Sequence, residues 1–299
     1  MKAEGRSLRI GVELDDAGVT AVAVDDRVQT RASVEVTGDL QRAASAALRQ
    51  VTRGAATPPP TGVACFAPDG QAVSDVVAAF ATEFGGMRPS VVASGTAAAV
   101  AEAWIGAAAG VGDVVFFAVR NHTTAGIVRQ GVPVTGTHGH AASIAWLSLN
   151  PVEREDYRKS GCLEAEVAAA GIVRRLVWRV KSGDQSRVQD AVGGDLAAIT
   201  VDHVFNAARG NDGVAVSVVR DTAKYLGMAA ANLVLVADPE TLVLGGFMAS
   251  AADLLLEPVR AELSRRLPRV MMDALKIVPA TLGGDAAAIG AARLAATGR

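Results

Sequence analysis

Residues 114–134 read VVFFAVRNHTTAGIVRQGVPV, a stretch in which short β-rich runs alternate with polar turn residues. Enrichment in β-branched and aromatic residues between such turns predicts three strands, at 114–119, 125–129 and 132–134. The N-terminal part of the chain opens in the same way, with runs at Leu8 to Leu14, Val19 to Val24 and Val28 to Val36. Because this three-strand opening occurs twice, we predict that one kind of α/β unit is used twice.

The first half of the chain continues as an alternation of helices and strands. Asp15-Asp16-Ala17-Gly18 has the composition of a hairpin turn, since Asp and Gly tolerate positive φ. The runs that follow predict a helix from Gly38-Asp39 to about Arg53, a strand at 62–67, a helix at 71–84, a strand at 90–93 and a helix from Ser94. This βββαβαβα order is typical of the RNase H-like half of the actin-like ATPase and sugar kinase fold, which we therefore predict.

The second half predicts a larger lobe. Its expected elements are helices at Leu163 to Lys181, Asp195 to Arg209, Gly213 to Leu235 and Ala251 to Leu267, strands at Thr241 to Leu244 and Leu275 to Ala280, and a last helix from Asp285. We expect residues 1–108 to form a smaller lobe on which the C-terminal helix 285–299 packs back, and residues 109–284 to form the larger lobe. Two lobes predict a ligand-binding cleft between them.

Charge and composition limit the partners of this chain. The formal net charge is -2 and the pI is about 6.1, so no overall charge attracts nucleic acid or an anionic membrane. Apolar runs such as Leu226 to Ala237 are shorter than the roughly 20 residues of a membrane helix. With only Cys65 and Cys162 and no apolar leader, we expect a cytoplasmic protein. One predicted helix carries a basic face that we expect to be solvated: Arg174, Arg175, Arg179 and Lys181.

Five segments carry a family resemblance. In chain order they are Gly161-Cys162-Leu163-Glu164-Ala165, Ala223-Lys224-Tyr225-Leu226-Gly227, Ala231-Asn232-Leu233-Val234, Asp238 to Gly246 and Asp285 to Ala292. In order and spacing they resemble the ROK family of repressors, uncharacterised proteins and sugar kinases. The resemblance implies the sugar kinase fold, a homodimer and, in the kinases, phosphorylation of a sugar by ATP. The repressors of the family carry a winged helix-turn-helix before the first strand. Since only residues 1–7 precede the first predicted strand in this sequence, we expect no such module.

The two phosphate-binding hairpins that the resemblance implies are altered here. Asp-(Ile/Val)-Gly-Gly-Thr is replaced by Glu13-Leu14-Asp15-Asp16-Ala17, and Gly-Thr-Gly-Ile-Gly is replaced by Arg120-Asn121-His122-Thr123-Thr124. An aspartate about 4 Å from a phosphate is unfavourable by about 4 kcal/mol at an effective dielectric of 20. We interpret the first hairpin as a solvated turn, the alternative being magnesium binding by Glu13 or Asp15. Arg120 is either a surface arginine or an anion ligand.

The sugar-binding positions that the resemblance implies are partly changed. The family's catalytic Asn-Asp pair is matched by Ala93 and Ser94, and a serine hydroxyl is not a base near neutral pH. We predict that Ser94 and Thr96 instead cap the following helix. Glu164 matches the sugar-binding glutamate of the family. The long loop that closes over the sugar in the kinases is missing at Asp69-Gly70.

The resemblance also implies a structural zinc ion, which these residues do not suit. The family's Gly-Glu-Ile-Gly-His segment reads Ala142-Ser143-Ile144-Ala145-Trp146, and of its three cysteines only Cys162 remains, with Glu155 and Tyr157 at the other two positions. Zinc needs about four N or S ligands. His138 and His140 form a His-Gly-His pair, but no neighbouring acid or cysteine completes a metal site. We therefore expect no metal and no cofactor.

Three functions remain open, in this order. The first is a catalytically inactive sugar kinase homologue that serves as a binding, regulatory or assembly protein, with a small molecule or a protein as partner and no nucleic acid. The second is a glucokinase-like, ATP-dependent kinase with a rewired site. The third is a new small-molecule site in the old cleft. Its candidate lining is Ser94, Thr96, His140, Ser143 and Glu164. Separately, Gly245 and Gly246 are either a vestigial nucleotide site or glycines required by backbone geometry after a strand.

Overall fold

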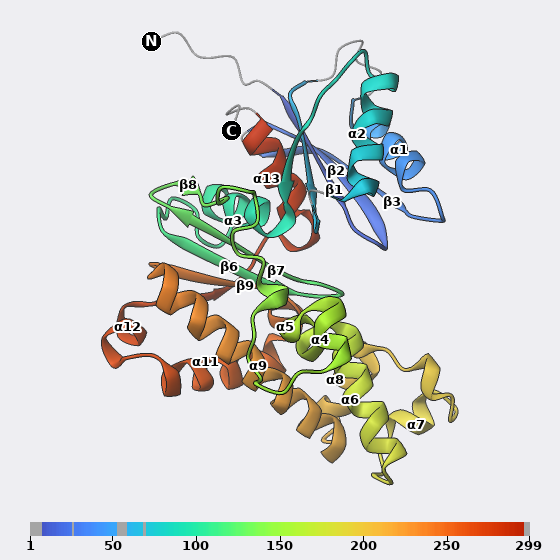
Figure 1. The fold of residues 1–299 in the computed structure, drawn as a ribbon, viewed down its shortest axis with the longest axis vertical. Coiled ribbons are helices and arrows are strands. Elements are labelled where there is room, and N and C mark those ends of the chain that lie inside the picture. Colours follow the sequence, from blue (N-terminus) through green and yellow to red (C-terminus); the bar gives the residue numbers. More distant parts are fainter. Residues whose placement is uncertain (1–7, 26, 53–58, 68–69, 296–299) are drawn as a thin grey trace. The chain divides into compact units, whose positions relative to one another are not determined.

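The computed structural model of the protein describes residues 8–25, 27–52, 59–67 and 70–295 (Figure 1). Within the described residues, the chain divides into two compact units. Unit 1 is formed by segments of 1–116, 125–142 and 280–299, and unit 2 by 117–124 and 143–279. The predictions about residues 1–7 and about the short connection at Asp69 concern positions outside the described residues.

Unit 1 is built on a mixed five-stranded sheet with the order β3-β2-β1-β4-β5. Its strands are β1 (Arg9–Leu14), β2 (Gly18–Val24), β3 (Val28–Glu35), β4 (Thr61–Cys65) and β5 (Ser90–Ala93). The central strand β1 is antiparallel to β2 and parallel to β4, with Val12 opposite Ala21 and Val63. The predicted fold class is confirmed in this sheet.

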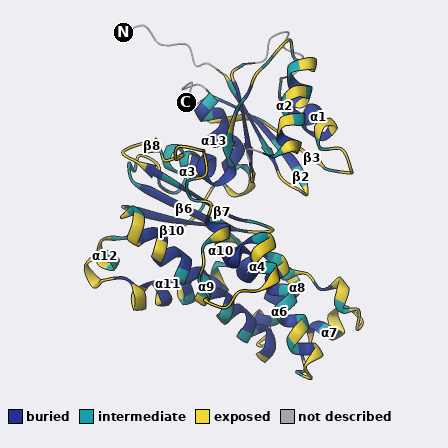
Figure 2. Cartoon of the chain, in the orientation of Figure 1, coloured by how far each residue is buried: buried dark blue, intermediate teal, exposed yellow. Residues whose placement is uncertain are grey.

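Helices cover both faces of this sheet (Figure 1). Its inner strands β1, β2 and β4 are largely buried, whereas the edge strands β3 and β5 are mostly exposed or half-buried (Figure 2). Alternate strand residues point to opposite faces of a sheet. On one face, Ile10 and Val12 pack with helices α1 (Leu40–Thr52) and α2 (Gln71–Glu83). On the other face, Val22 and Val24 pack with helix α13 (Ala286–Ala295). Helix α3 (Ser94–Trp104) packs on α13.

A glycine in β1 allows α13 to lie directly on the sheet. A Cβ atom on Gly11 would lie 1.7 Å from the carbonyl oxygen of Ala288, which is far inside contact distance. The bare glycine therefore lets the helix backbone approach the strand backbone.

The second sheet has the strand order β10-β9-β6-β7-β8. Its strands are β6 (Val114–Val119), β7 (Thr123–Arg129), β8 (Val132–Pro133), β9 (Thr241–Gly246) and β10 (Lys276–Pro279). In unit 2, β9 and β10 are parallel, with Leu242 opposite Ile277. The stretch 114–134 thus forms the three strands that its composition predicts.

Unit 2 is rich in helices. They are α4 (Glu155–Ser160), α5 (Cys162–Val167), α6 (Ala169–Lys181), α7 (Val188–Ala191), α8 (Val201–Arg209), α9 (Gly213–Ala237), α10 (Phe247–Ser250), α11 (Ala252–Arg266) and α12 (Arg269–Ala274). Short 3-10 turns lie at Ile144–Trp146 and Leu196–Ala198, and one in unit 1 at Gly283–Asp285. In the part of the chain that the structure describes, no helix is both long enough and apolar enough to cross a bilayer.

Two predicted helices are interrupted in the structure. The helix expected at Leu163 to Lys181 is two helices, because Ala168 has an extended backbone (φ −65°, ψ 162°) and the amide of Ala169 donates to the carbonyl oxygen of Arg120. The helix expected at Asp195 to Arg209 begins only at Val201, where the Thr200 side chain caps it. At each break, a backbone amide bonds to a group other than a carbonyl of one continuous helix: Ala169 donates to Arg120, and His203 donates to the Thr200 side chain.

Candidate functional site

The structure places the predicted ligand-binding residues in both units. Unit 1 contains Ser94, Thr96 and His140, and unit 2 contains Ser143, Glu164 and the pair Gly245-Gly246. Of these residues, Glu164 makes the contacts that best define a site.

The start of α3 does not have the predicted caps. The N-cap residue is Ala93, which has no side chain that could accept a hydrogen bond, and Ser94 is already the first helical residue. Ser94 and Thr96 are 8% and 2% exposed. The capping prediction is wrong because the chain turns directly from β5 into α3. Gly95 there lies so close to β7 that a Cβ would be 2.1 Å from the Ala125 carbonyl oxygen.

The turn between β1 and β2 is compact and its two aspartates are exposed. Asp15 and Gly18 exchange backbone hydrogen bonds of 3.0 and 3.3 Å, and the Asp15 carboxylate accepts from the amide of Ala17 at 3.4 Å. This Asx-type contact explains an aspartate at this turn without a ligand. The interpretation as a solvated turn stays a prediction, because exposed carboxylates also suit magnesium.

Glu164 connects α5 to the turn between β6 and β7. Its side chain is 10% exposed. Its Oε2 atom accepts hydrogen bonds from the amide of Thr123 at 2.9 Å and from the Thr123 hydroxyl at 3.3 Å. Its Oε1 atom lies 3.2 Å from Nδ1 of His122. The Arg120 carbonyl at the start of the same turn accepts from Ala169 at 2.9 Å, so this turn is held by both α5 and α6.

The Glu164 carboxylate is suited to a ligand with hydroxyl groups. An ionised carboxylate accepts at about four lone-pair positions, and the contacts above account for three of them. A buried carboxylate that is held in place and can accept a further hydrogen bond discriminates in favour of a donor such as a sugar hydroxyl. Sequence reasoning identified Glu164 but missed Thr123 and His122, because these partners lie about 40 residues earlier in the chain.

The other predicted residues have simpler surroundings. His140 and Ser143 are exposed, and Ser143 precedes a 3-10 turn that its side chain does not cap. Gly246 has φ +61° and ψ −132°, and a Cβ there would lie 2.0 Å from the carbonyl oxygen of Val119. Backbone conformation and packing therefore account for a glycine at 246.

The zinc ion that the family resemblance implies does not fit these residues. The Glu155 side chain is 80% exposed and pairs with Lys159 on the same helix. The Tyr157 hydroxyl donates to Glu166, and Cys162 is a buried free thiol. Trp146, at the position of the family histidine, is 59% exposed. Among the described residues, no group of three His, Cys, Asp or Glu side chains could hold a metal ion.

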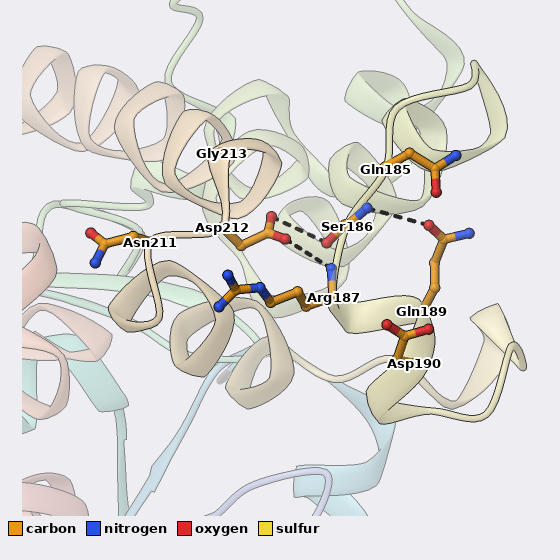
Figure 3. Close-up of a pocket in the computed structure, with 8 residues that line it drawn as sticks. All are labelled: Gln185, Ser186, Arg187, Gln189, Asp190, Asn211, Asp212 and Gly213. Carbon is orange, nitrogen blue, oxygen red and sulfur yellow. Dashed lines mark hydrogen bonds between the residues drawn. The ribbon is translucent and has the colours of Figure 1, made fainter.

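A polar pocket of about 400 Å³ lies at the N-terminus of α9 (Figure 3). Asp212, which caps α9, accepts from the amides of Ala215 at 2.9 Å and Arg187 at 2.8 Å and from the Ser186 hydroxyl at 3.2 Å. Burial alone would raise the pKa of Asp212, but these hydrogen bonds outweigh it and the pKa lies below its ordinary value. The carboxylate in this pocket therefore serves the fold.

Comparisons with known proteins agree with this architecture. Residues 68–297 match the ROK family. A glucokinase from Halalkalibacterium halodurans is 36% identical over 197 residues, 64% of this chain and 59% of that protein. The DNA-binding transcriptional dual regulator NagC from Escherichia coli is 28% identical over 185 residues, 62% of this chain and 44% of the regulator. The matched region thus spans less than two thirds of either relative.

Solved structures share the fold over nearly the whole chain. A ROK family glucokinase from Streptomyces griseus, in complex with glucose and AMPPNP, has a TM-score of 0.81 at 24% identity and covers 97% of this chain and 99% of that chain. A ROK hexokinase from Thermus thermophilus has a TM-score of 0.74 at 23% identity and covers 96% and 97%. At this level of identity, the likeness shows the fold.

Proposed function

Because this chain belongs to the ROK family and has its sugar kinase fold, we propose that it is an ATP-dependent kinase of a hexose or amino sugar with a rearranged active site. Relatives that are named glucokinases support this function over the inactive homologue that the altered motifs favour. The observation that carries the proposal is the Glu164 carboxylate, which is buried and held in place by the amide and hydroxyl of Thr123.

Phosphoryl transfer is compatible with the altered hairpins, although at a lower rate. Catalysis of this reaction comes mainly from positioning and electrostatic stabilisation, because the protein does little covalent chemistry. Arg120 is exposed beside the β6–β7 turn and suits an anionic phosphate, and carboxylates such as Asp15 offer the oxygen ligands that magnesium prefers. With Ser94 in place of a general base, we expect turnover roughly 10² to 10⁴ times slower than with a carboxylate.

A coupled assay of ADP release with glucose, N-acetylglucosamine and N-acetylmannosamine tests the proposal. Glu164→Ala should abolish turnover, whereas Glu257→Ala, whose side chain is 83% exposed on α11, should leave it unchanged. Ser94→Asp should raise kcat if a base is the missing group, provided that circular dichroism shows a folded protein. Absence of ADP release with every sugar, for both the wild type and Ser94→Asp, would contradict a kinase.

A second candidate is a sugar-binding protein without catalysis. One observation favours it. Ser94, which stands where the resemblance places the catalytic base of the kinases, is a serine at the first residue of α3 and is only 8% exposed. Isothermal titration separates the two candidates. Sugar binding that Glu164→Ala removes, without turnover in any variant, would establish the non-catalytic function, and turnover above the background rate would exclude it.

A further inference from the structure

Helix α5 carries two buried glutamates that have different partners. Glu164 accepts from Thr123 in the β6–β7 turn. Glu166, whose side chain is 4% exposed, accepts from the Tyr157 hydroxyl at 2.5 Å, from Nη1 of Arg154 at 3.1 Å and from Nη1 of Arg175 at 3.0 Å. Since each residue turns about 100° around a helix, residues two apart point to roughly opposite sides. Helix α5 is therefore attached on both sides through carboxylates.

The contacts of Glu166 extend to neighbouring helices of unit 2. Arg175 on α6 also donates to the Thr222 hydroxyl on α9 at 2.5 Å, so it links α5, α6 and α9. Arg154 lies 5.0 Å from the ring centroid of Tyr157 on α4, a cation–π distance. The predicted solvated basic face is wrong for Arg175, whose side chain is only 18% exposed. The sequence pattern missed this because the acidic partner lies on another helix.

A second carboxylate joins the same group of arginines. Asp156 accepts from Nη2 of Arg154 at 2.9 Å and from Nη1 of Arg174 at 2.5 Å. Nη2 of Arg174 donates to the carbonyl oxygen of Ala165 within α5 at 2.8 Å. We call this group of six side chains the arginine cluster. Its members are Arg154, Asp156, Tyr157, Glu166, Arg174 and Arg175.

The chemistry of the arginine cluster excludes a cation. Burial, followed by the hydrogen bond to Glu166, raises the pKa of Tyr157, so its hydroxyl remains a donor. Burial lowers the pKa of Arg175, although its two bonded partners still fit the protonated guanidinium. Three guanidinium groups surround two carboxylates, so a metal ion here would meet positive charge and acceptors that are already engaged.

We propose that the arginine cluster fixes α5 without a metal ion and thereby positions Glu164 against Thr123. A helix of six residues is too short to be stable alone, so its place depends on tertiary contacts. Glu166 makes such contacts on one side of α5. They fix the helix in the position in which Glu164, on its other side, accepts from Thr123. This role of Glu166 as a positioning residue does not depend on whether a sugar is bound or phosphorylated.

Amide hydrogen exchange, combined with metal analysis, tests the inference. Glu166→Gln should speed exchange of the Thr123 amide at least tenfold and lower Tm by roughly 5–10 °C, because it leaves buried guanidinium charge unpaired. Amides of β9, a buried strand elsewhere in unit 2, should be accelerated by a clearly smaller factor than the Thr123 amide. The matched control is Glu155→Gln on α4, whose side chain is 80% exposed and which should change neither quantity.

A second variant and a chelator keep the test decisive. Tyr157→Phe retains every charge of the arginine cluster and should speed Thr123 exchange by a smaller factor, even if Glu166→Gln does not fold. The purified wild type should contain no stoichiometric zinc, and EDTA should leave its Tm unchanged. One bound zinc ion per chain with a Tm that falls in EDTA would overturn the inference. So would exchange at Thr123 that neither variant alters, or equal acceleration throughout unit 2.

Discussion

Replacement of Glu102 by glutamine should loosen unit 1 at one defined place. Glu102 lies near the end of α3 and is 0% exposed. Its carboxylate accepts from the amides of Ala107 at 2.7 Å, Thr281 at 3.0 Å and Leu282 at 3.0 Å, and from the Thr281 hydroxyl at 3.3 Å. One buried side chain thus joins α3 to a segment 179 residues later, directly before α13.

The expected loss follows from these four hydrogen bonds. Glutamine keeps one acceptor oxygen for Thr281 and Leu282, but its NH₂ group then faces the amide of Ala107. A buried donor without a partner costs about 1–3 kcal/mol. The remaining bonds also lose the charge assistance that roughly doubles their strength. Together, these effects predict a loss of about 3 kcal/mol of local stability for Glu102→Gln.

Native-state hydrogen exchange measures this loss at the three amides that Glu102 holds. A loss of about 3 kcal/mol corresponds to exchange that is roughly 100-fold faster. Glu257→Gln is the control, since that side chain is 83% exposed. The reasoning is refuted if Glu102→Gln accelerates exchange of Ala107, Thr281 and Leu282 by less than about threefold, because the carboxylate would then contribute almost nothing to this junction.

Three further predictions concern packing and ionisation. Gly290→Ala should destabilise unit 1 by more than the roughly 1–3 kcal/mol that overpacking usually costs, because the new Cβ would lie 1.8 Å from a backbone carbonyl oxygen of α3. A Cβ at Gly213 would meet nothing within 4 Å, so Gly213→Ala should be tolerated. Denaturant unfolding of both variants measures the difference. Asp212→Asn should destabilise by about 1 kcal/mol at neutral pH, because an NH₂ donor replaces one of the two carboxylate oxygens that accept hydrogen bonds. Since the pKa of Asp212 is depressed in the fold, this difference should vanish as the pH falls through that pKa, and a difference that persists in acid contradicts the assignment. Burial raises the pKa of both tyrosines, Tyr157 and Tyr225, so ultraviolet titration should show little tyrosinate near pH 10, where a free tyrosine is half ionised.

The chemistry of the site could be predicted only in part. Glu164 was identified through a short segment that resembles a family, and its role as a sugar ligand remains a prediction. The capping role predicted for Ser94 is wrong, since Ala93 holds the N-cap position. A hydroxyl at the start of a helical pattern indicates a cap only if the turn before the helix places it one residue outside, and that depends on how closely β5 and α3 approach β7.

The sequence by itself determined the strands, most of the longer helices and their order along the chain. The helix predicted at 71–84 is α2, Gln71–Glu83, and the strand predicted at 90–93 is β5. Such elements follow from the spacing of apolar residues along a short stretch, so the information is local. The repeated three-strand opening likewise indicated a fold used twice, and the first sheet has the expected strands.

Only the tertiary structure decided which buried polar groups meet. Glu102 finds Thr281, and Glu164 finds Thr123. The long helix predicted through Ala168 is broken where the next amide bonds to a distant turn. The physical reason is that a buried donor or acceptor must be paired wherever the path of the chain places it. That path brings together residues whose separation in sequence carries no periodic signal.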